Sequence, residues 1–330
     1  MKIAIVILNW NGKHLLQTFL PSVVEHSPEA DIYVADNAST DDSISFLKDH
    51  FPEVKLIQNS ENFGFAKGYN VALKKVNADV LCILNNDVEV TDHWLRPIIS
   101  LFKNNHELAI VQPKILDYKS KYQFEYAGAA GGYIDKYAYP YCRGRLFHTL
   151  EDDKGQYDDQ QDIFWASGAC LFIKNDLFHE LGGFDPSFFA HMEEIDLCWR
   201  AFNQDKLIKY EGSSTVYHVG GATLSDNNPR KTYLNFRNSL VMLAKNIPHK
   251  GYTSTIFKRL LLDGVAALHF LIQGKPKHFL SVLKAHISFY GRLGQIKHFR
   301  GDHSFKSNYY QIRSIVWAYF IQKKRQFNRL

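Results

Sequence analysis

Residues 79–89 read Asp-Val-Leu-Cys-Ile-Leu-Asn-Asn-Asp-Val-Glu, an apolar run that stops abruptly at two asparagines and an aspartate. An uninterrupted apolar run of this length is typical of a strand that is buried on both faces of a parallel sheet. In open α/β sheets, ligands bind at the carboxyl ends of the strands. We therefore expect Asp87 to be delivered to a binding edge by a buried strand.

The same pattern occurs twice earlier in the chain. The apolar run Ile3–Leu8 leads into Asn9-Trp10-Asn11-Gly12, and Ile32–Ala35 leads into Asp36-Asn37-Ala38-Ser39-Thr40-Asp41. Three buried strands thus direct polar groups to one edge of the predicted sheet. This repetition indicates a site more strongly than any single strand ending does.

Strand and helix patterns alternate through the first 112 residues. The expected strands are 2–8, 31–35, 54–58, 79–84 and 108–112, and the expected helices are 13–26, 65–76 and two that begin near 40 and 92. Alternation at this spacing predicts an α/β fold with a mostly parallel central sheet flanked by helices.

The alternation breaks down between Pro113 and about Asp162. Residues 128–141 are rich in Gly and Tyr and residues 151–162 are acidic and polar, so we expect an irregular excursion with a mobile loop. Regularity returns with a predicted strand at 164–174 and a predicted helix at 191–203. From Tyr233 onward the chain is expected to be mostly helical.

The composition is that of a protein built around one core. A chain of 330 residues with 45% hydrophobic content is sufficient for one sizeable α/β domain and an appendage. Its four cysteines lie far apart and lack zinc-type spacing, which predicts reduced thiols. The apolar run after Lys2 is too short for a secretory signal, and Leu260–Ile272 is too short and too polar to span a bilayer, so we expect a cytoplasmic protein.

The charge is distributed unevenly. Residues 245–330 hold sixteen Lys and Arg against two Asp and Glu, a balance of +14, whereas the whole chain carries +5 and residues 1–244 therefore carry −9. An acidic body with a basic C-terminal third predicts contact with an anionic surface, either a membrane or a nucleic acid.

Asp87 and Asp36 are candidate ligand-binding carboxylates. Asp87 is a candidate ligand of a divalent cation that bridges a substrate diphosphate, because hard cations prefer carboxylate oxygens. The alternative is that Asp87 is a solvated loop residue or a helix cap. Asp36 is placed to accept from a nucleobase or a ribose hydroxyl, while Ser39, Thr40 and Asp41 serve as helix caps. The loop Asn62–Asn70 has two glycines that let its backbone approach a ligand, with Lys67 placed to meet phosphate. The local sequence by itself favours the alternative, an ordinary glycine-containing loop.

Three carboxylates, Glu193, Glu194 and Asp196, fall at the start of a predicted helix. One of them is a candidate general base with a pKa raised by the neighbouring like charges; the alternative is that they are first-turn acids favoured by the helix dipole. His218 ends a short strand-like run beside glycines, where a ligand role competes with a structural one.

Together these segments resemble the family 2 glycosyltransferases of the GT-A fold, and within them the rhamnosyltransferase-like branch of bacterial surface-polysaccharide biosynthesis. The resemblance covers residues 1 to about 245. It is carried by Val6–Gly12, Asp36–Asp41, Asn62–Asn70, Leu84–Asp87, Ser167–Ala169, Gly182–Asp185, Phe188-Phe189, Glu193–Arg200 and Tyr217–Gly221.

The resemblance implies an inverting enzyme that moves one sugar from a nucleotide-diphosphate sugar to a hydroxyl of a glycan or lipid-linked glycan. It implies a GT-A catalytic domain over 1–245, with a nucleotide-binding half at about 1–112 and an acceptor half at about 113–245, and a basic helical region over 246–330. The rivals are a sugar nucleotidyltransferase and, less in keeping with the acidic body, a nucleic-acid-binding protein.

The resemblance also assigns roles to residues. Glu194 would be the base, with Glu193 as the alternative, and Asp87 with His218 would bind Mg²⁺ or Mn²⁺. Asp196 and Arg237 would serve the acceptor or the diphosphate. The donor nucleotide would be bound by Asn9, Asn11, Asp36, Asn37, Asn62, Gly64, Lys67 and Asn86.

Three departures from the family pattern bear on these roles. Asn85 replaces the first acidic residue of the metal motif, which shifts metal coordination toward Asp87 and His218. The base position carries Glu rather than Asp. There is no Gln-x-x-Arg-Trp segment, which favours addition of a single sugar over processive synthesis.

The basic region after Lys245 predicts attachment to the inner face of the plasma membrane. Apolar residues are interleaved there with cations, as suits a lipid interface: Leu260, Leu261, Val265, Leu268, Phe270 and Ile272 alternate with Lys258, Arg259, Lys275 and Lys277, and Lys323-Lys324-Arg325 follows Val316–Phe320. The alternative is that these apolar positions pack on the catalytic domain.

Overall fold

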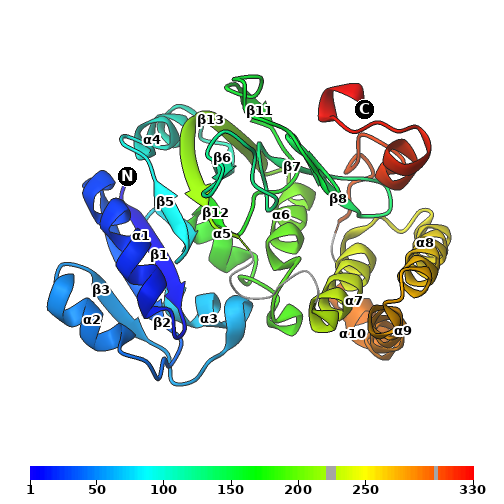
Figure 1. Ribbon diagram of the computed structural model, residues 1–330, viewed down its shortest axis with the longest axis horizontal. Coiled ribbons are helices and arrows are strands. Elements are labelled where there is room, and N and C mark those ends of the chain that lie inside the picture. Colours follow the sequence, from blue (N-terminus) through cyan, green and yellow to red (C-terminus); the bar gives the residue numbers. More distant parts are fainter. Residues whose placement is uncertain (221–227, 301–303) are drawn as a thin grey trace.

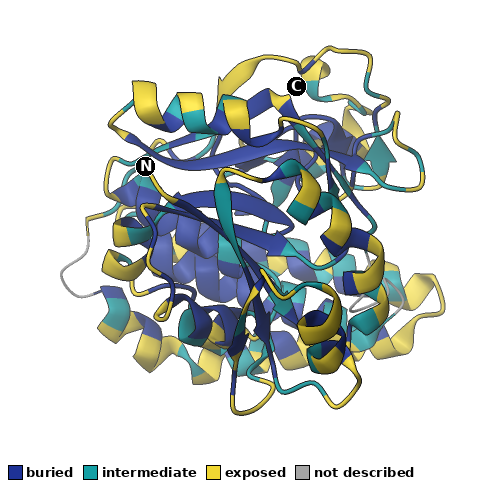
Figure 2. Cartoon of the chain, turned by 90° about the vertical axis from the view of Figure 1, so that its left-hand side faces the viewer, coloured by how far each residue is buried: buried dark blue, intermediate teal, exposed yellow. Residues whose placement is uncertain are grey.

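A nine-stranded sheet forms the centre of the molecule in the computed structural model, which describes residues 1–220, 228–300 and 304–330 (Figure 1). Eight of its strands run in the order β11-β13-β6-β12-β4-β1-β2-β3, and β5 pairs with β13. Two apolar clusters fill its two faces. Figure 2 shows the buried strands lying between helices whose outer sides are exposed.

The first half of the sheet is parallel, as predicted. It comprises β1 (Ile3–Asn9), β2 (Ala30–Asp36), β3 (Lys55–Gln58) and β4 (Val80–Asn85), which are connected by α1 (Lys13–His26), α2 (Ser43–His50) and α3 (Gly64–Leu73). On α1 the buried residues Leu16, Phe19, Leu20 and Val23 recur at helical spacing, which fixes the face that packs on the sheet. The predicted elements of this half are confirmed to within a few residues.

The second half of the sheet is mixed. The strand β12 (Cys170–Lys174) lies antiparallel between β4 and β6 (Leu108–Asp117), and α4 (Leu95–Asn104) precedes β6. The predicted strand at 164–174 is therefore too long at its start. Next to β6 lies β13 (Leu207–His218), which also pairs with the three-residue β5 (Val88–Val90). The β5–β13 pairing brings Asp87 beside His218, and it is the strand β5 that the sequence patterns did not predict.

The irregular excursion predicted for residues 113–162 is wrong in part, because several short strands interrupt it. The strand β6 continues through Pro113, where its register with β13 is interrupted by a bulge, which is a setting that tolerates proline. A second sheet follows, made of β7 (Gly132–Ile134), β8 (Pro140–Cys142), β9 (Arg145–Leu146) and β10 (Thr149–Leu150).

The acidic stretch 151–162 is paired with buried cations of the sheet region. Lys114 pairs with Asp153 at 2.8 Å and also with Asp158, and Arg143 contacts Asp159 at 2.7 Å. The stretch ends in β11 (Gln160–Asp162), which pairs with β13. Its acidic composition is therefore explained by ion pairing to the sheet.

The C-terminal part is helical to Arg300, as predicted, and the described residues 304–330 add only the short helical turns Trp317–Ile321 and Phe327–Arg329. The short α5 (Asn175–Glu180) and α6 (Glu193–Asn203) are followed by α7 (Pro229–Asn246), α8 (Tyr252–Ile272), α9 (Pro276–Gly291) and α10 (Leu293–Arg300). Residues 304–330 run mostly without regular structure and contact the second sheet, where Thr149 and Tyr319 share a hydrogen bond of 2.8 Å. Within the described residues, no helix is long and apolar enough to cross a membrane.

Candidate active site

The carboxyl ends of β1, β2 and β4 meet at one edge, as predicted. Asn9 is level with Asp36 on β2, and its neighbour Leu8 is level with Asn85 on β4. The amide of Asn9 donates to Asp36 at 3.3 Å, and Asn86 donates to the Asn9 carbonyl oxygen at 3.0 Å. The edge is therefore a connected polar network that joins three strands.

Asp36 also organises the turn that follows it. Its carboxylate accepts from the backbone N–H of Ser39 at 2.8 Å, and the side chain of Asn11 accepts from the N–H of Thr40 at 2.7 Å. Asn11 has a φ of 49°, which asparagine tolerates better than most residues. Gly12 is required beside them, because a Cβ there would lie 2.4 Å from the Asn9 oxygen.

A second amide cluster forms beside β2. The side chain of Asn37 donates to the Gly64 carbonyl at 2.9 Å and to Asn62 at 3.3 Å. Gly68 on α3 lies against it, since a Cβ at that position would be 2.8 Å from the Asn37 amide. The loop therefore needs its glycines for close packing.

Lys67 is the outlier of the predicted donor-binding residues. Its ammonium lies 4.0 Å from the ring centre of Phe63 and 3.7 Å from Glu61, and its side chain is half exposed. The structure does not bring it to the network of Asn9 and Asp36 by any described contact.

Asp87 and His218 lie together, as predicted. The two side chains are buried and approach to 3.2 Å between a carboxylate oxygen of Asp87 and Nε2 of His218. The amide of Asn85 lies 3.2 Å from the same nitrogen. On the other side of the ring, Nδ1 is 3.4 Å from the carboxylate of Glu125.

Electrostatics place a proton on this histidine. Burial alone would lower the pKa of His218, but Asp87 and Glu125 outweigh it and raise the pKa to about 10. A positive charge is thus favoured between the two carboxylates. A divalent cation is suited to the same electrostatic environment.

The donor set fits a hard divalent ion of the Mg²⁺ or Mn²⁺ kind. Such ions need only one or two carboxylates from the protein and take their other ligands from water and substrate phosphates. Within the described residues, no group of three or more His, Cys, Asp or Glu side chains has the arrangement of a metal site. The pair of Asp87 and His218 would hold such an ion together with water and substrate phosphates.

The candidate bases begin α6. Glu193 is buried and Glu194 is half-buried in the first turn of the helix. Burial, and next the charge of Glu194, raise the pKa of Glu193 well above its usual range, whereas burial raises the pKa of Glu194 to about 7. A carboxylate that titrates near neutral pH is suited to accept a proton.

A chain of contacts places Glu194 near the end of β4. Gly168 lies against it, since a Cβ at Gly168 would be 3.8 Å from the Cβ of Glu194. The next residue, Ala169, accepts a hydrogen bond of 3.0 Å from the backbone of Asn85. The base candidate and the metal candidate are thus connected through residues 168 and 169 near the end of β4.

The backbone before Glu193 is strained. Phe189, His191 and Met192 have φ values of 65°, 70° and 75°, which are uncommon for residues other than glycine. Asn238 on α7 secures this loop, because its amide donates to the carbonyls of Phe188, Ala190 and His191 at 2.7 to 3.0 Å.

Arg237 secures the same loop. Its guanidinium donates to the carbonyls of Ser187 and Phe188, both at 3.0 Å. Its predicted role at the diphosphate stays a prediction, while its observed contacts support the backbone that precedes the bases.

Asp196 has a different environment from the one predicted. It is fully buried, and its carboxylate accepts from Arg200 at 2.8 Å, Lys245 at 3.1 Å and Asn246 at 2.9 Å. These contacts tie α6 to α7. The geometry favours a structural role for Asp196 over contact with the acceptor.

Sequence reasoning did not find Glu125 and Asn238. Glu125 lies in the region that was interpreted as irregular, and no local pattern marks it. Asn238 lies inside a helix, where its backbone contacts cannot be inferred. The predicted motif residue Gly221 lies outside the described residues.

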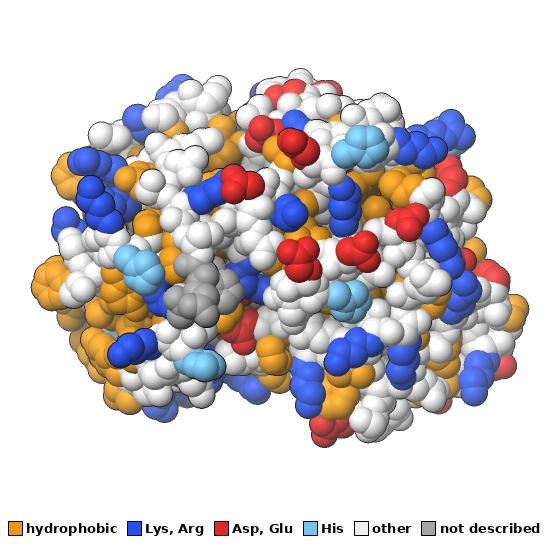
Figure 3. Space-filling model, turned by 180° about the vertical axis from the view of Figure 1, so that it is seen from behind, with side chains coloured by type: hydrophobic (Ala, Val, Ile, Leu, Met, Phe, Trp, Pro, Cys, Tyr) orange, Lys and Arg blue, Asp and Glu red, His pale blue; other side chains and the backbone are white. Residues whose placement is uncertain are grey.

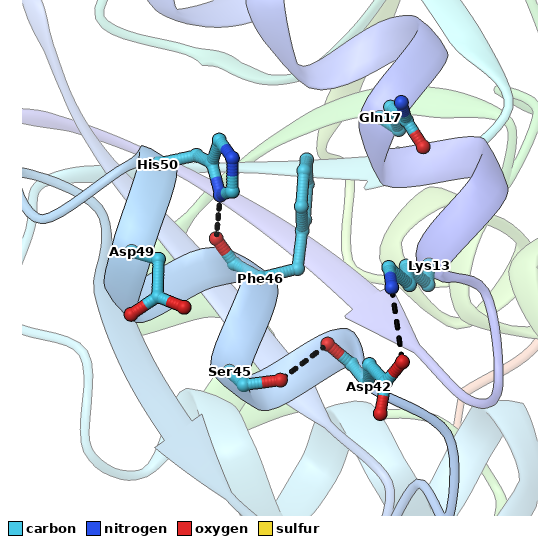
Figure 4. Close-up of a pocket in the computed structure, with 7 residues that line it drawn as sticks. All are labelled: Lys13, Gln17, Asp42, Ser45, Phe46, Asp49 and His50. Atoms are coloured by element: carbon cyan, nitrogen blue, oxygen red, sulfur yellow. Dashed lines mark hydrogen bonds and ion pairs between the residues drawn. The ribbon is translucent and has the colours of Figure 1, made fainter.

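A depression between α1 and α2 is separate from this edge (Figure 4). Lys13 pairs there with Asp42 at 3.0 Å, and His50 contacts the carbonyl of Phe46 at 3.1 Å. Its polar groups are thus largely paired within the protein.

Residues 4–182 match glycosyl transferase family 2. The chain belongs to this family. The match confirms the resemblance and favours a glycosyltransferase over the nucleotidyltransferase and nucleic-acid-binding alternatives. Family membership and the fold together account for the clustering of polar strand ends at one edge.

Relatives of known name support the same conclusion. The chain is 21% identical over 288 residues to the low-salt glycan biosynthesis hexosyltransferase of Haloferax volcanii, covering 84% of this chain and 87% of that protein. It is 23% identical over 224 residues to the N-acetylglucosaminyl-diphospho-decaprenol L-rhamnosyltransferase of Mycobacterium tuberculosis, covering 63% and 72%.

Solved structures confirm the GT-A fold. GalNAc-T7 with UDP, GalNAc and Mn²⁺ superposes with a TM-score of 0.66 at 15% identity, covering 98% of this chain, which spans 57% of that structure. Staphylococcus aureus TarS 1–349 with UDP-GlcNAc gives 0.60 at 14% identity, covering 91% and 90%.

Proposed function

We propose that this glycosyltransferase moves one sugar from a nucleotide-diphosphate sugar to a hydroxyl group, with inversion at the anomeric carbon. The observation that carries the proposal is the convergence of Glu194 with the end of β4, where Asp87 meets His218. A base on one side and a diphosphate site on the other are what direct displacement requires.

The residues have distinct roles in this mechanism. Glu194 accepts the proton of the acceptor hydroxyl as the new bond forms, and its pKa of about 7 leaves it partly ionised at neutral pH. Asp36 and the amides of Asn9 and Asn86 bind the nucleoside of the donor. Asp87 and His218 would hold Mg²⁺ or Mn²⁺, and the ion would supply positive charge next to the departing nucleoside diphosphate.

The acceptor that we propose is a glycan or a lipid-linked glycan of the cell envelope. The support is the names of the relatives, one of which is a rhamnosyltransferase acting on a diphospho-decaprenol-linked sugar. A lipid-linked acceptor would place the enzyme on the cytoplasmic face of the plasma membrane.

A donor screen tests the proposal. The full chain is offered a panel of nucleotide sugars with Mn²⁺, and release of nucleoside diphosphate is measured with and without chelator. We expect one donor to be hydrolysed slowly without acceptor, in a chelator-sensitive manner. The absence of release from every donor, with or without glycan acceptors, would contradict the proposal.

A further inference from the structure

The helices α8 and α9 each expose one apolar stripe. On α8 the exposed large apolar side chains are Phe257, Leu261, Val265, Leu268, Leu271 and Ile272, and on α9 they are Leu280, Leu283, Ile287 and Tyr290. Their spacing of three and four residues places each set on one side of its helix. Val265, Ile287 and Ile272 are 65%, 71% and 83% exposed, so these are not partly covered core residues.

The opposite sides of both helices are firmly packed. On α8 the buried residues include Arg259 and Asp263, which pair at 2.8 Å, and Tyr139 of the catalytic body donates to Asp263 at 2.7 Å. On α9 they include His278, whose ring contacts the hydroxyl of Thr232 on α7 at 2.8 Å. The two helices are therefore fixed to the body by their buried sides, and their apolar stripes face outward.

Only some of the apolar and basic residues that the sequence predicts at a lipid interface are exposed. The exposed ones are Leu261, Val265, Leu268 and Ile272. In contrast, Leu260 packs against the core, and Arg259 lies on the buried side of α8. The ring of Phe270 stacks on that of His278. The interface is thus a two-helix face to which α9 contributes.

The charge around the stripes has one sign. Lys258, Lys275, Lys277 and Lys284 are exposed on or between the helices, and Figure 3 shows hydrophobic side chains gathered with Lys and Arg near them at the left side of the view. Both helices lie wholly within the described residues, and their one acidic residue, Asp263, is buried. The face therefore offers cations without any exposed carboxylate.

We propose that the α8–α9 face docks on an anionic lipid bilayer, with its apolar stripes entering the headgroup boundary and its lysines contacting lipid phosphates. Apolar surface bordered by lysine is the composition of interfacial helices. A second copy of the chain is a poor occupant, because two such faces would bring like charges together. This inference rests on the proposed function, since a lipid-linked acceptor lies at a membrane.

Co-sedimentation of the full chain with vesicles tests the docking. The vesicles contain phosphatidylglycerol with phosphatidylcholine, or phosphatidylcholine alone. We expect the protein to pellet with the anionic vesicles, and to do so less at high salt because exposed charges are screened. The double variant Lys275→Glu/Lys277→Glu should bind at least about tenfold more weakly.

A matched control separates docking from net charge. Lys48→Glu/Lys103→Glu makes the same change in charge at exposed lysines of the nucleotide-binding half, and it should bind vesicles like the unaltered protein. The triple variant Val265→Ser/Ile272→Ser/Ile287→Ser tests the stripes without altering charge and should also release the protein.

Two results would overturn the proposal. One is equal vesicle binding by the unaltered protein and by both face variants. The other is a dimer in size-exclusion chromatography that the triple variant dissociates, together with no vesicle binding, which would make the face a contact between copies. Donor hydrolysis measured without vesicles reports on the proposed function separately, and we expect both face variants to retain it.

Discussion

Two buried clusters of acidic and basic side chains differ in how completely they are paired. The helix cluster joins Asp196 to Arg200, Lys245 and Asn246, and Lys245 also contacts Asp185 at 2.7 Å. The edge cluster consists of Asp87, His218 and Glu125, and in it one histidine lies between two carboxylates, at 3.2 Å from Asp87 and 3.4 Å from Glu125.

The difference separates structure from function. A buried carboxylate that is saturated by cations holds elements together and has little left to offer a ligand. A cluster at a strand edge that has two carboxylates and one cation is suited to take up further positive charge with a substrate or an ion. The same residue types thus have opposite roles, and their partners decide which.

The largest expected effect is on Asp87. Replacement Asp87→Ala should abolish metal-dependent transfer while the protein stays folded, because loss of a metal ligand removes several kcal/mol of charge stabilisation. Activity and thermal unfolding are measured on the same preparation. Retention of more than about a tenth of the activity would exclude the metal role, since each tenfold corresponds to about 1.4 kcal/mol.

The helix cluster provides the contrasting variant. Asp196→Asn leaves Lys245 and Arg200 without their shared carboxylate, and breaking a buried pair typically costs about 3–5 kcal/mol of folding free energy. Denaturant unfolding should show this loss, whereas Mn²⁺ affinity of the folded protein should be unchanged. An unaltered stability would refute the structural assignment.

The next effect is on the base. Glu194→Gln keeps the size of the side chain and should lower turnover by about 10²–10⁴-fold with little change in donor binding. The neighbouring Glu193→Gln is the control. If Glu193→Gln shows the large loss and Glu194→Gln does not, then the assignment within the pair is wrong.

A smaller effect is expected at Glu125. Its carboxylate faces Nδ1 of His218 and would orient the ring for a metal ion bound at Nε2. Loss of such an outer partner typically weakens metal binding by about 10–100-fold. Glu125→Gln should do so in a calorimetric Mn²⁺ titration with the donor nucleotide present, whereas Glu89→Gln, on β5, should not.

The smallest effect is the pH dependence. Burial raises the pKa of Glu194 to about 7, and only the ionised form accepts a proton, so kcat/KM should rise with pH up to about 7 and then level off. The sign for stability is opposite. The folded state holds this proton more tightly than the unfolded state, so the stabilisation is lost as pH rises from about 4.5 to about 7. A rate profile that is flat between pH 5 and 8 would contradict Glu194 as the base.

The edge was predictable because it is built from long apolar strands. The run that ends at Asp87 identifies β4 and its carboxylate without any knowledge of tertiary structure. The strand β5 could not be predicted because three residues are too few to show a period. Without β5, no local pattern indicates that Asp87 meets His218. The family resemblance supplied that pairing.

Other residues were misjudged because their partners are distant in the chain. First-turn acids on α6 look alike in sequence, although the spacing from Asp196 to Arg200 is that of an ion pair within a helix and could have indicated a structural role. Lys114 and Arg143 pair with acids that lie 16 to 44 positions away, so the acidic stretch seemed unconstrained. Periodicity carries no information about such contacts.

Arg300 has a consequence for how this enzyme can be shortened. Its guanidinium donates to the carbonyls of Ala244, Lys245 and Ile247 at 2.8 to 3.2 Å, and so a side chain far along the sequence closes the carboxyl end of α7. A chain ending near Asn246 would lose that closure while keeping the helix whose Asn238 and Arg237 hold the catalytic loop. Deletion of the last helices would thus disturb the candidate active site indirectly, through α7. Point substitutions on the exposed surface of α8 and α9 are therefore the safer way to study the C-terminal helices separately from catalysis.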